Sequence, residues 1–310
     1  MNILISGYTG FIGSNLTKTL KDHTLFGVDI SETSSVSFHL NWDTLQYCKE
    51  IDCIIHLAGK AHDTKNISDK QEYYQINVGL TQKIFHHFLN SSATKFIFFS
   101  SVKAVADSVD TDQLTEDKIP DPKTPYGKSK LEAERLILSH PLAANKKIYI
   151  LRPCMIHGPG NKGNLNLLYK LVKKGYAWPL GGYENKRSFT SIDNLIFIIR
   201  QLIEKNIEPG IYHIADDEAL STNELIGLIA LSLNRKSKIW NIPEKFIHFL
   251  ARIGDYLHLP INSERLKKLT ESYVVSNKKI KQALGVEVMP VTAIAGFKKT
   301  FESFNNKNIK

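Results

Sequence analysis

The chain has 310 residues, 42% hydrophobic and 23% charged, a composition typical of a soluble globular protein with a sizeable core. Its formal net charge is +9, but the lysines are dispersed in short pairs and no basic-aromatic motif of a nucleic-acid-binding module occurs. The N-terminus lacks the basic segment of a signal peptide, and the apolar segments are too short to span a bilayer. We therefore expect a cytoplasmic protein that favours anionic ligands and binds no nucleic acid.

The three cysteines, Cys48, Cys53 and Cys154, show no metal-ligand spacing and form no even disulfide set. Such a pattern fits a reducing compartment. We expect no metal site.

The chain begins with a strand, a glycine-rich turn and a helix. An apolar run at residues 2–6 is followed by Gly7, Gly10 and Gly13, and then by a helical pattern. In a dinucleotide-binding turn the first glycine lets the chain turn, the second lets backbone amides approach a pyrophosphate, and the third lets the helix pack closely. The diphosphate would lie at the helix N-terminus. The alternative is an ordinary glycine turn.

A second expected strand, residues 24–29, ends in Asp29, 22 residues after Gly7. An acid at this distance would accept hydrogen bonds from the adenosine ribose and repel a 2′-phosphate. No arginine or lysine lies between Ile30 and Leu40 to bind such a phosphate. The pattern favours NAD over NADP, unless Asp29 is only a turn residue.

Residues 52–59 predict a buried strand that ends in small residues, where ligands bind in open α/β sheets. His56, inside this apolar run, is interpreted as structural rather than catalytic. The next helix, about residues 69–90, carries Asn77 among apolar neighbours. This amide would either bond the backbone near the cofactor or serve as an internal tether.

Residues 95–101 predict a strand that ends in two hydroxyls, Ser100 and Ser101. A loop then leads to a helix at about residues 126–139, which carries Tyr126 and Lys130. Four residues apart, the two side chains share one helix face, where a cation would lower the pKa of the phenol. Alone, most such pairs are coincidences, but Ser101 would hydrogen-bond a substrate oxygen beside the phenol.

Strands alternating with helices predict an α/β fold, a doubly wound parallel sheet (Rossmann) with a smaller C-terminal α/β substrate-binding portion. The expected division is a NAD-binding core at 1–152 and a substrate-binding portion at 153–310, from which some helices and a strand at 211–215 return to the core. Helices in the second portion are predicted at about 165–174, after a loop at 158–164, and at 193–205, 223–233, 243–258 and 276–284.

The chain resembles the extended short-chain dehydrogenase/reductase family, and within it the NAD-dependent nucleotide-sugar epimerases and reductases, most closely the UDP-glucose 4-epimerase-like subgroup. The resemblance covers about residues 2–200. It rests on the following residues: Gly7, Gly10, Gly13, Asp29, the run His56-Leu57-Ala58-Gly59, Asn77, Ser100, Ser101, Tyr126, Lys130, Arg152, Pro153, the run Arg187-Ser188-Phe189, Asp193 and Asn194.

The resemblance implies that Tyr126 is the acid-base at the sugar C4 hydroxyl, that Ser101 orients the C4 oxygen, and that Lys130 is the electrostatic partner and a ribose ligand. It implies cofactor contacts from Gly7, Gly10, Phe11, Ile12, Gly13, Asp29, Leu57, Ala58, Gly59, Asn77, Ser100, Tyr126 and Lys130. For the substrate, it implies that Arg187 pairs with a diphosphate, that Asn164 contacts the nucleotide, and that Lys103 also binds.

Three departures from the family pattern change these expectations. Val102 and Lys103 stand where sugar dehydratases of the family carry an Asp-Glu pair, which disfavours 4,6-dehydratase activity. The adenine-reading acid after the second strand is replaced around His39. Met155 stands where many epimerases place an asparagine, which weakens the expectation of diphosphate contacts there.

Several functions stay open at this point. The first is a NAD-dependent 4-epimerase of a UDP-hexose or UDP-N-acetylhexosamine, acting by transient oxidation at C4. The second is a NAD(P)H-dependent 4-keto-reductase of a UDP-6-deoxy-N-acetylhexosamine in surface polysaccharide synthesis. The others are an epimerase of a polyprenyl-diphosphate sugar and a non-catalytic dinucleotide-binding protein.

The helix expected at 243–258 carries an apolar stripe. The stripe comprises Phe246, Ile247, Phe249, Leu250, Ile253 and Leu257. This helix would either pack over the sugar site or contact a membrane surface peripherally.

The resemblance also implies a homodimer, formed through the helices at about 69–90 and 126–139.

Overall fold

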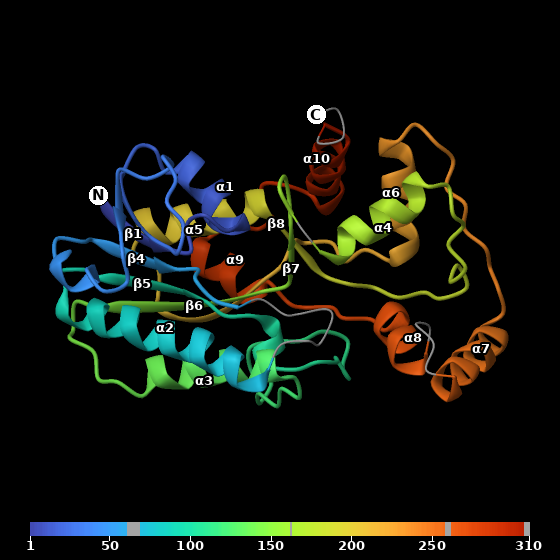
Figure 1. The fold of residues 1–310 in the computed structure, drawn as a ribbon, viewed down its shortest axis with the longest axis horizontal. Helices are drawn as coiled ribbons and strands as arrows, with labels where there is room; N and C mark the ends of the chain where they lie inside the picture. The colour runs from blue at the N-terminus through green and yellow to red at the C-terminus, as the bar shows by residue number, and fades with distance from the viewer. Residues whose placement is uncertain (61–68, 162, 258–261, 307–310) are drawn as a thin grey trace.

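The structure, a computed structural model, describes residues 1–60, 69–161, 163–257 and 262–306. Figure 1 shows a parallel sheet with helices on both faces and, beside it, a smaller lobe made mainly of helices. The prediction of a doubly wound α/β fold is confirmed.

Seven parallel strands form the sheet, in the order β3-β2-β1-β4-β5-β6-β9. They are β1 (Asn2–Ser6), β2 (Thr24–Val28), β3 (Phe38–Leu40), β4 (Cys53–His56), β5 (Lys95–Phe99), β6 (Lys147–Pro153) and β9 (Gly210–Ile214). The order changes direction between β1 and β4. Ligands of such sheets bind at this switch point, outside the carboxyl ends of the strands.

Alternation along the strands divides the core into two layers. On β1, Ile3 and Ile5 belong to one buried cluster, and Leu4 between them belongs to another. The first cluster includes side chains from α1 (Phe11–Thr19), α5 (Ile192–Glu204) and α9 (Lys278–Leu284). The second includes side chains from α2 (Lys70–Asn90) and α3 (Pro125–Leu138). The strands therefore read as continuous apolar runs because both faces are covered.

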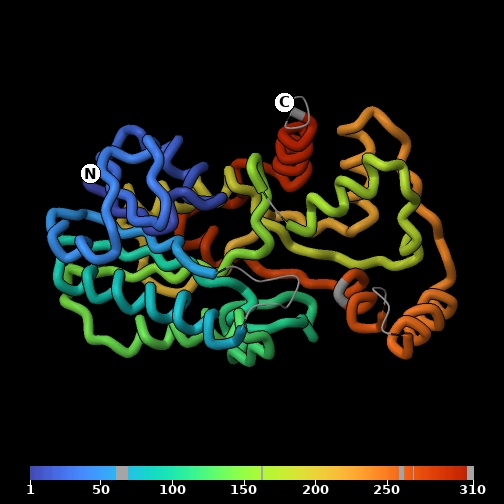
Figure 2. Tube along the Cα trace, viewed as in Figure 1, coloured from blue at the N-terminus to red at the C-terminus, as the bar shows by residue number. Residues whose placement is uncertain are grey.

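The second lobe has its own apolar core. The chain enters this lobe after β6, returns to the sheet with α5 and β9, and enters the lobe again with α6 (Figure 2). Its elements are β7 (Met155–His157), α4 (Asn164–Lys173), β8 (Phe189–Ser191), α6 (Thr222–Ser232), α7 (Glu244–Tyr256), α8 (Ser263–Thr270) and α10 (Ala293–Asn306). Phe297 and Phe301 of α10 pack in this core against α4 and α6. The boundary at residue 152 stays a prediction.

Several elements were not expected from the sequence: β3, β7, β8, α8 and α10. The three strands are each three residues long, which is too short for an alternating pattern to predict them from the sequence. Their pairing partners lie 12 or more residues away in the chain. Helix α10 is different, because Phe297, Phe301 and Phe304 are spaced for one helix face, a signal that sequence analysis missed.

Helix α7 does not pack its whole apolar stripe inward. Ile247, Ala251 and Gly254 are buried, whereas the rest of the stripe is exposed. Whether the helix covers the sugar site or contacts a membrane stays a prediction. Residue 258, the expected end of this helix, lies outside the described residues. Within the described ranges, no helix is both long enough and apolar enough to cross a bilayer.

Candidate active site

The glycine turn joins β1 to α1 at the switch point of the sheet. Gly7 has φ +74°, and a Cβ added there would lie 2.6 Å from the backbone nitrogen of Ala58. A Cβ on Gly13 would lie 2.5 Å from the carbonyl oxygen of Gly7, so α1 packs directly on the turn. Gly10 is the N-cap of α1, and Phe11 and Ile12, half-buried, form its first turn. Backbone N–H groups of this turn are thus available to an anion at the carboxyl edge of β1.

Asp29 directly follows β2 and faces this turn. One carboxylate oxygen accepts hydrogen bonds from the Thr9 nitrogen at 3.0 Å and the Thr9 hydroxyl at 2.8 Å. The other oxygen accepts from the Ile30 nitrogen at 2.8 Å. A carboxylate oxygen has a second lone pair, so Asp29 keeps acceptor capacity beside the turn.

Small residues after the end of β4 lie against α2 and α3. A Cβ on Gly59 would lie 2.9 Å from Asn77 Oδ1 and 3.2 Å from the Lys130 ammonium. Asn77 is buried, accepts from the Lys60 nitrogen at 2.7 Å and donates to the Ser129 hydroxyl at 2.9 Å. Asn77 therefore bonds the backbone of Lys60, directly after Gly59, and also ties this segment to α3, so it makes the contacts that both alternatives expected.

His56 is a structural histidine, as predicted. Its two ring nitrogens make hydrogen bonds with the Ser6 hydroxyl at 2.6 Å and the Thr81 hydroxyl at 2.9 Å. Burial, with the charge of Lys130, lowers its pKa well below the ordinary value, so the ring stays neutral.

Tyr126 and Lys130 lie on the first turns of α3, and the helix start explains their placement. Thr124 caps the helix by accepting from the Gly127 nitrogen at 3.2 Å, and Pro125 occupies the first helical position. The Tyr126 phenol is hydrogen-bonded to Ser101, which follows β5. The Lys130 ammonium donates to the carbonyl oxygen of Phe99 at 2.9 Å. The structure thus brings the three predicted catalytic residues together.

The pKa values correct one expectation. Burial raises the pKa of Tyr126, the hydrogen bond with Ser101 lowers it in part, and Tyr73, whose ring meets it edge-on, raises it further. Burial also lowers the pKa of Lys130 to about 8, against the influence of Glu134. The expectation that a neighbouring lysine sets a lowered phenol pKa is therefore wrong for the protein alone, because desolvation is the larger effect.

A buried ion pair supports this end of the sheet. Glu134 accepts from Arg152 Nε at 2.9 Å and from Arg152 Nη2 at 2.5 Å, and it also accepts from the Ser100 hydroxyl. Glu134 lies one turn after Lys130 on α3. Sequence analysis missed it, although its spacing of four from Lys130 was a usable signal.

A second cationic group lies where the two parts of the chain meet. The Lys103 ammonium lies 4.1 Å from the centre of the Tyr273 ring and donates to the Asp107 carbonyl oxygen at 2.9 Å. Burial lowers the pKa of Lys103, and the pKa of Arg187 is lowered by burial too; each also feels the charge of Glu271. Lys103 and Arg187 are close enough to affect each other electrostatically, and Tyr273 had not been predicted here.

Asn164 is exposed at the first residue of α4, after the cap residue Gly163. Its contact with a nucleotide stays a prediction. This prediction rests on the family resemblance alone.

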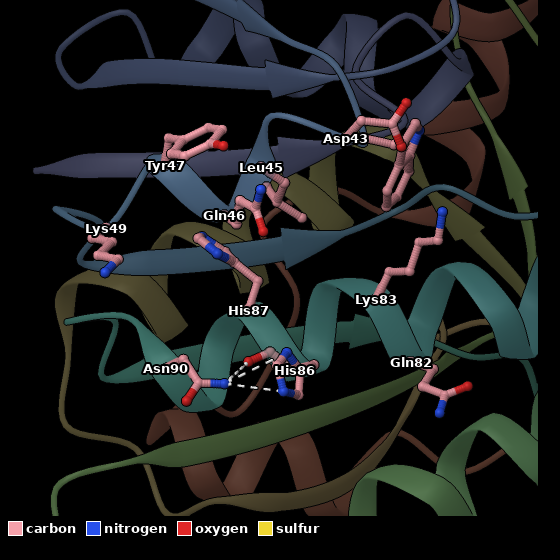
Figure 3. A pocket seen from close by; sticks show the side chains of 11 residues that line it. Asp43, Leu45, Gln46, Tyr47, Lys49, Gln82, Lys83, His86, His87 and Asn90 are labelled. Atoms are coloured by element: carbon pink, nitrogen blue, oxygen red, sulfur yellow. Dashed lines mark hydrogen bonds between the residues drawn. The ribbon is translucent and has the colours of Figure 1, made fainter.

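The groove in Figure 3 lies elsewhere. It has a volume of about 840 Å³ and runs between the C-terminal half of α2 and the short 3-10 helix η1 (Leu45–Tyr47). His86, His87 and Asn90 line it from α2. These elements precede β4 and β5, so the groove is at the amino ends of the strands, away from Tyr126. We assign no chemistry to it.

One group of potential metal ligands occurs among the described residues, made of Asp22, His23 and Glu204. Arg200 already pairs with Asp22 at 2.6 Å and with Glu204 at 3.3 Å. Both carboxylates of this group therefore already pair with a guanidinium, and we assign no metal site.

A parallel sheet, a glycine turn with an acid at the next strand, and a Ser/Tyr/Lys set together define a dinucleotide-dependent enzyme of the short-chain dehydrogenase/reductase type. Residues 3–215 match the model of the NAD dependent epimerase/dehydratase family. The chain therefore belongs to this family.

Individual relatives cover nearly the whole chain. The UDP-glucose 4-epimerase of Vibrio cholerae is 29% identical over 99% of this chain and 96% of its own length. The N-acetyl-alpha-D-glucosaminyl-diphospho-ditrans,octacis-undecaprenol 4-epimerase of Escherichia coli O157:H7 is 26% identical over 91% of this chain and 85% of its own. The solved structure of UDP-glucose 4-epimerase from Thermotoga maritima, with UDP-glucose, superposes with a TM-score of 0.78 at 20% identity and covers all of both chains. That last likeness shows the fold.

Proposed function

We propose that this protein is a nucleotide-sugar 4-epimerase that uses NAD and acts on a UDP-hexose or UDP-N-acetylhexosamine. The observation that carries the proposal is the hydrogen-bonded Ser101–Tyr126 pair with the Lys130 ammonium one helix turn away, at the carboxyl end of β5. Relatives at 29% and 26% identity are both named as 4-epimerases, which supports the same reaction.

The residues around the glycine turn fit NAD. Gly7 and Gly13 let the turn pack closely on the segment after β4 and on α1, and Gly10 places no side chain at the N-terminus of α1, where a diphosphate would lie. Asp29 would accept hydrogen bonds from the adenosine ribose and would repel a 2′-phosphate. Residues 30–40, all described, contain no arginine or lysine to offset that repulsion. NAD therefore fits better than NADP.

The protein's own residues would move the proton. Tyr126, as phenolate, would take the proton from the C4 hydroxyl, and Ser101 would hold the same oxygen. The glycine turn and Asp29 would hold NAD, and this cofactor would supply reversible hydride acceptance at C4. Lys130, fixed by Phe99, would stabilise the phenolate electrostatically. The proton on Tyr126 returns to the C4 oxygen when the ketone is reduced.

Lys103 and Arg187 would bind the substrate diphosphate. Burial lowers the pKa values of both cations, which means that their charged forms are poorly solvated. An anion that binds between them would stabilise these charges. Glu271 partly neutralises them in the protein alone. A guanidinium fork beside an ammonium is well suited to two phosphates.

The experiment is to incubate the purified protein with UDP-hexoses and UDP-N-acetylhexosamines without added cofactor and to follow C4 configuration by NMR. A 4-epimerase produces the C4 epimer with retained NAD. If no epimer forms while a 4-keto sugar nucleotide consumes added NAD(P)H, the protein is the alternative 4-keto-reductase. The same Ser/Tyr/Lys set would serve either reaction.

Tyr126→Phe tests the assigned acid-base directly. It should abolish turnover while NAD binding is largely kept, because the ring remains and only the hydroxyl is lost. Tyr74→Phe, at an exposed phenol on α2, is the control and should keep full activity. Unchanged turnover in Tyr126→Phe would refute the role.

A second candidate substrate is a sugar linked to polyprenyl diphosphate. The Escherichia coli relative is named for such a substrate. The same diphosphate ligands would serve it, so assays should include a polyprenyl-diphosphate N-acetylhexosamine beside the nucleotide sugars.

A homodimer through α2 and α3 stays a prediction. The two helices pack side by side over one face of the sheet. Sedimentation velocity of the purified protein measures its oligomeric state.

A further inference from the structure

Helix α7 presents an apolar face that nothing in the described chain covers. Its side chains there are between 37% and 85% exposed. They are Phe246, Phe249, Leu250, Ile253, Tyr256 and Leu257. Spacings of three and four residues place all six on one side of the helix. Such a contiguous patch is unusual on a monomer surface and indicates a contact site.

The helix is held in place by a different side. Ile247 and Ala251 are buried in the core of the second lobe with Leu266 of α8, and Gly254 is buried too. Figure 1 shows α7 at the end of the molecule away from the seven-stranded sheet. The exposed face is therefore additional to the packing that anchors the helix, and its side chains are exposed.

The charges on α7 are arranged asymmetrically about this face. At about 100° per residue, Lys245 and Arg252 lie beside Phe249 and Tyr256 on the border of the apolar face. Both cations are exposed. The acids Glu244 and Asp255 lie on the far side of the helix by the same count.

Asp255 is also engaged in a local structural role. Its carboxylate accepts from the Ser263 nitrogen at 2.9 Å and from the Ser263 hydroxyl at 2.5 Å, which joins α7 to the start of α8. A surface approaching the apolar face would therefore meet positive charge at its border, in a chain of net charge +9.

We propose that this face of α7 docks on an anionic lipid bilayer, with the helix lying in the interface plane. Aromatic and aliphatic side chains enter the headgroup boundary, a border of Lys and Arg meets the lipid phosphates, and a Tyr lies at the edge; these are the features of interfacial helices. Six side chains on one helix fall well short of the roughly 20–30 residues a side in a stable protein interface. A bilayer needs no such area.

Docking does not depend on the proposed function, because it uses no residue of the active site. It would place the second lobe, and with it Lys103 and Arg187 between the two parts, near the membrane surface. A lipid-linked sugar diphosphate would then be within reach of the site.

The test uses the full-length protein and flotation with vesicles. One set is phosphatidylcholine alone, and the other contains about a third phosphatidylglycerol. We expect binding to the anionic vesicles that weakens at high salt, because the lysine and arginine contribution is screened. Absence of binding to both sets would overturn the proposal.

Two variants probe the two parts of the surface. Phe249→Ser combined with Leu250→Ser should weaken binding at least about tenfold by removing buried apolar area. Lys245→Glu combined with Arg252→Glu should abolish the preference for anionic vesicles. Leu231→Ser, at an exposed leucine of α6, is the control and should bind normally. Thermal unfolding of each variant shows whether it is folded.

The remaining outcomes also decide the question. Turnover of a water-soluble nucleotide sugar should be unchanged in all these variants, so failure of docking and failure of the proposed reaction are distinguishable. If the Phe249/Leu250 variant instead changes sedimentation and no variant changes vesicle binding, the face is a contact between copies of the chain, and the proposal is wrong.

Discussion

The Lys130 ammonium donates a 2.9 Å hydrogen bond to the carbonyl oxygen of Phe99, the last residue of β5. This cation is buried, and its nitrogen also lies 5.2 Å from the centre of the Phe98 ring. One carbonyl and a carboxylate a turn away replace the water that an ammonium normally has. The replacement is incomplete, which is why burial lowers the pKa of Lys130 to about 8.

Lys130→Met should remove a pH dependence of stability. Because the pKa of Lys130 is 10.5 in the unfolded chain and about 8 in the folded protein, the unfolded chain binds an extra proton between these values. The wild type should therefore gain about 2 kcal/mol of unfolding free energy, relative to Lys130→Met, between about pH 7 and about pH 9.5. Below the folded pKa the difference should be flat. Urea unfolding of both proteins measures this, and parallel curves throughout would show that the ammonium is not desolvated.

Glu134→Gln should destabilise the protein strongly. Glu134 and Arg152 are almost completely buried, and removing the carboxylate charge leaves the guanidinium without its compensating charge. We expect a loss of about 3–5 kcal/mol in urea unfolding. Glu132→Gln, two residues earlier on α3, breaks only an exposed contact of 3.7 Å with Arg135 and should cost less than about 1 kcal/mol. Similar losses in both variants would contradict the assigned importance of burial.

The parts of the site that could be predicted are those whose residues lie close together in the sequence at a characteristic spacing. Gly7, Gly10 and Gly13 follow a strand and open a helix, and Tyr126 and Lys130 share one helix face after a capping residue. The sheet could be predicted for the same reason, since its buried strands are apolar runs between helical patterns. His56 was assigned correctly because a histidine inside such a run needs internal partners.

What could not be predicted depends on contacts between distant segments. Tyr273 lies under Lys103, 170 residues away in the chain, and no local pattern connects them. The raised pKa of Tyr126 comes from burial in the folded protein, which the spacing to Lys130 does not reveal. The exposed face of α7 is similar, because an apolar stripe looks the same in sequence whether the chain covers it or not.

Gly13→Ala should destabilise the protein and remove NAD binding. The new Cβ would lie 2.5 Å from both the Gly7 carbonyl oxygen and Tyr8 Cα, which are backbone atoms of the turn itself. Helix α1 would have to move away, at a cost of about 1–3 kcal/mol. Gly227→Ala in α6 is the matched control, because a Cβ there meets nothing within 4 Å. It should stabilise by up to about 1 kcal/mol. Thermal unfolding and NAD titration measure both variants, and intact NAD binding in Gly13→Ala would refute the tight packing of turn and helix.

Asp29→Asn should lower the preference for NAD over NADP. The carboxylate charge would strengthen hydrogen bonds from a ribose and repel a 2′-phosphate, so its loss should weaken NAD binding by roughly 10-fold to 100-fold and NADP binding much less. The control is Glu32→Gln, an exposed acid three residues further on, which should change neither affinity.

The two roles of Asp29 can be separated by comparing the cofactors. The carboxylate also binds Thr9 in the glycine turn, at 2.8 Å and 3.0 Å, so Asp29→Asn disturbs the turn as well. A disturbed turn would weaken both cofactors equally, because both place the same diphosphate there. Calorimetric titration of NAD and NADP with each variant distinguishes the cases: a changed ratio of the two dissociation constants supports a ribose contact, and an unchanged ratio would leave Asp29 as a support for the turn alone.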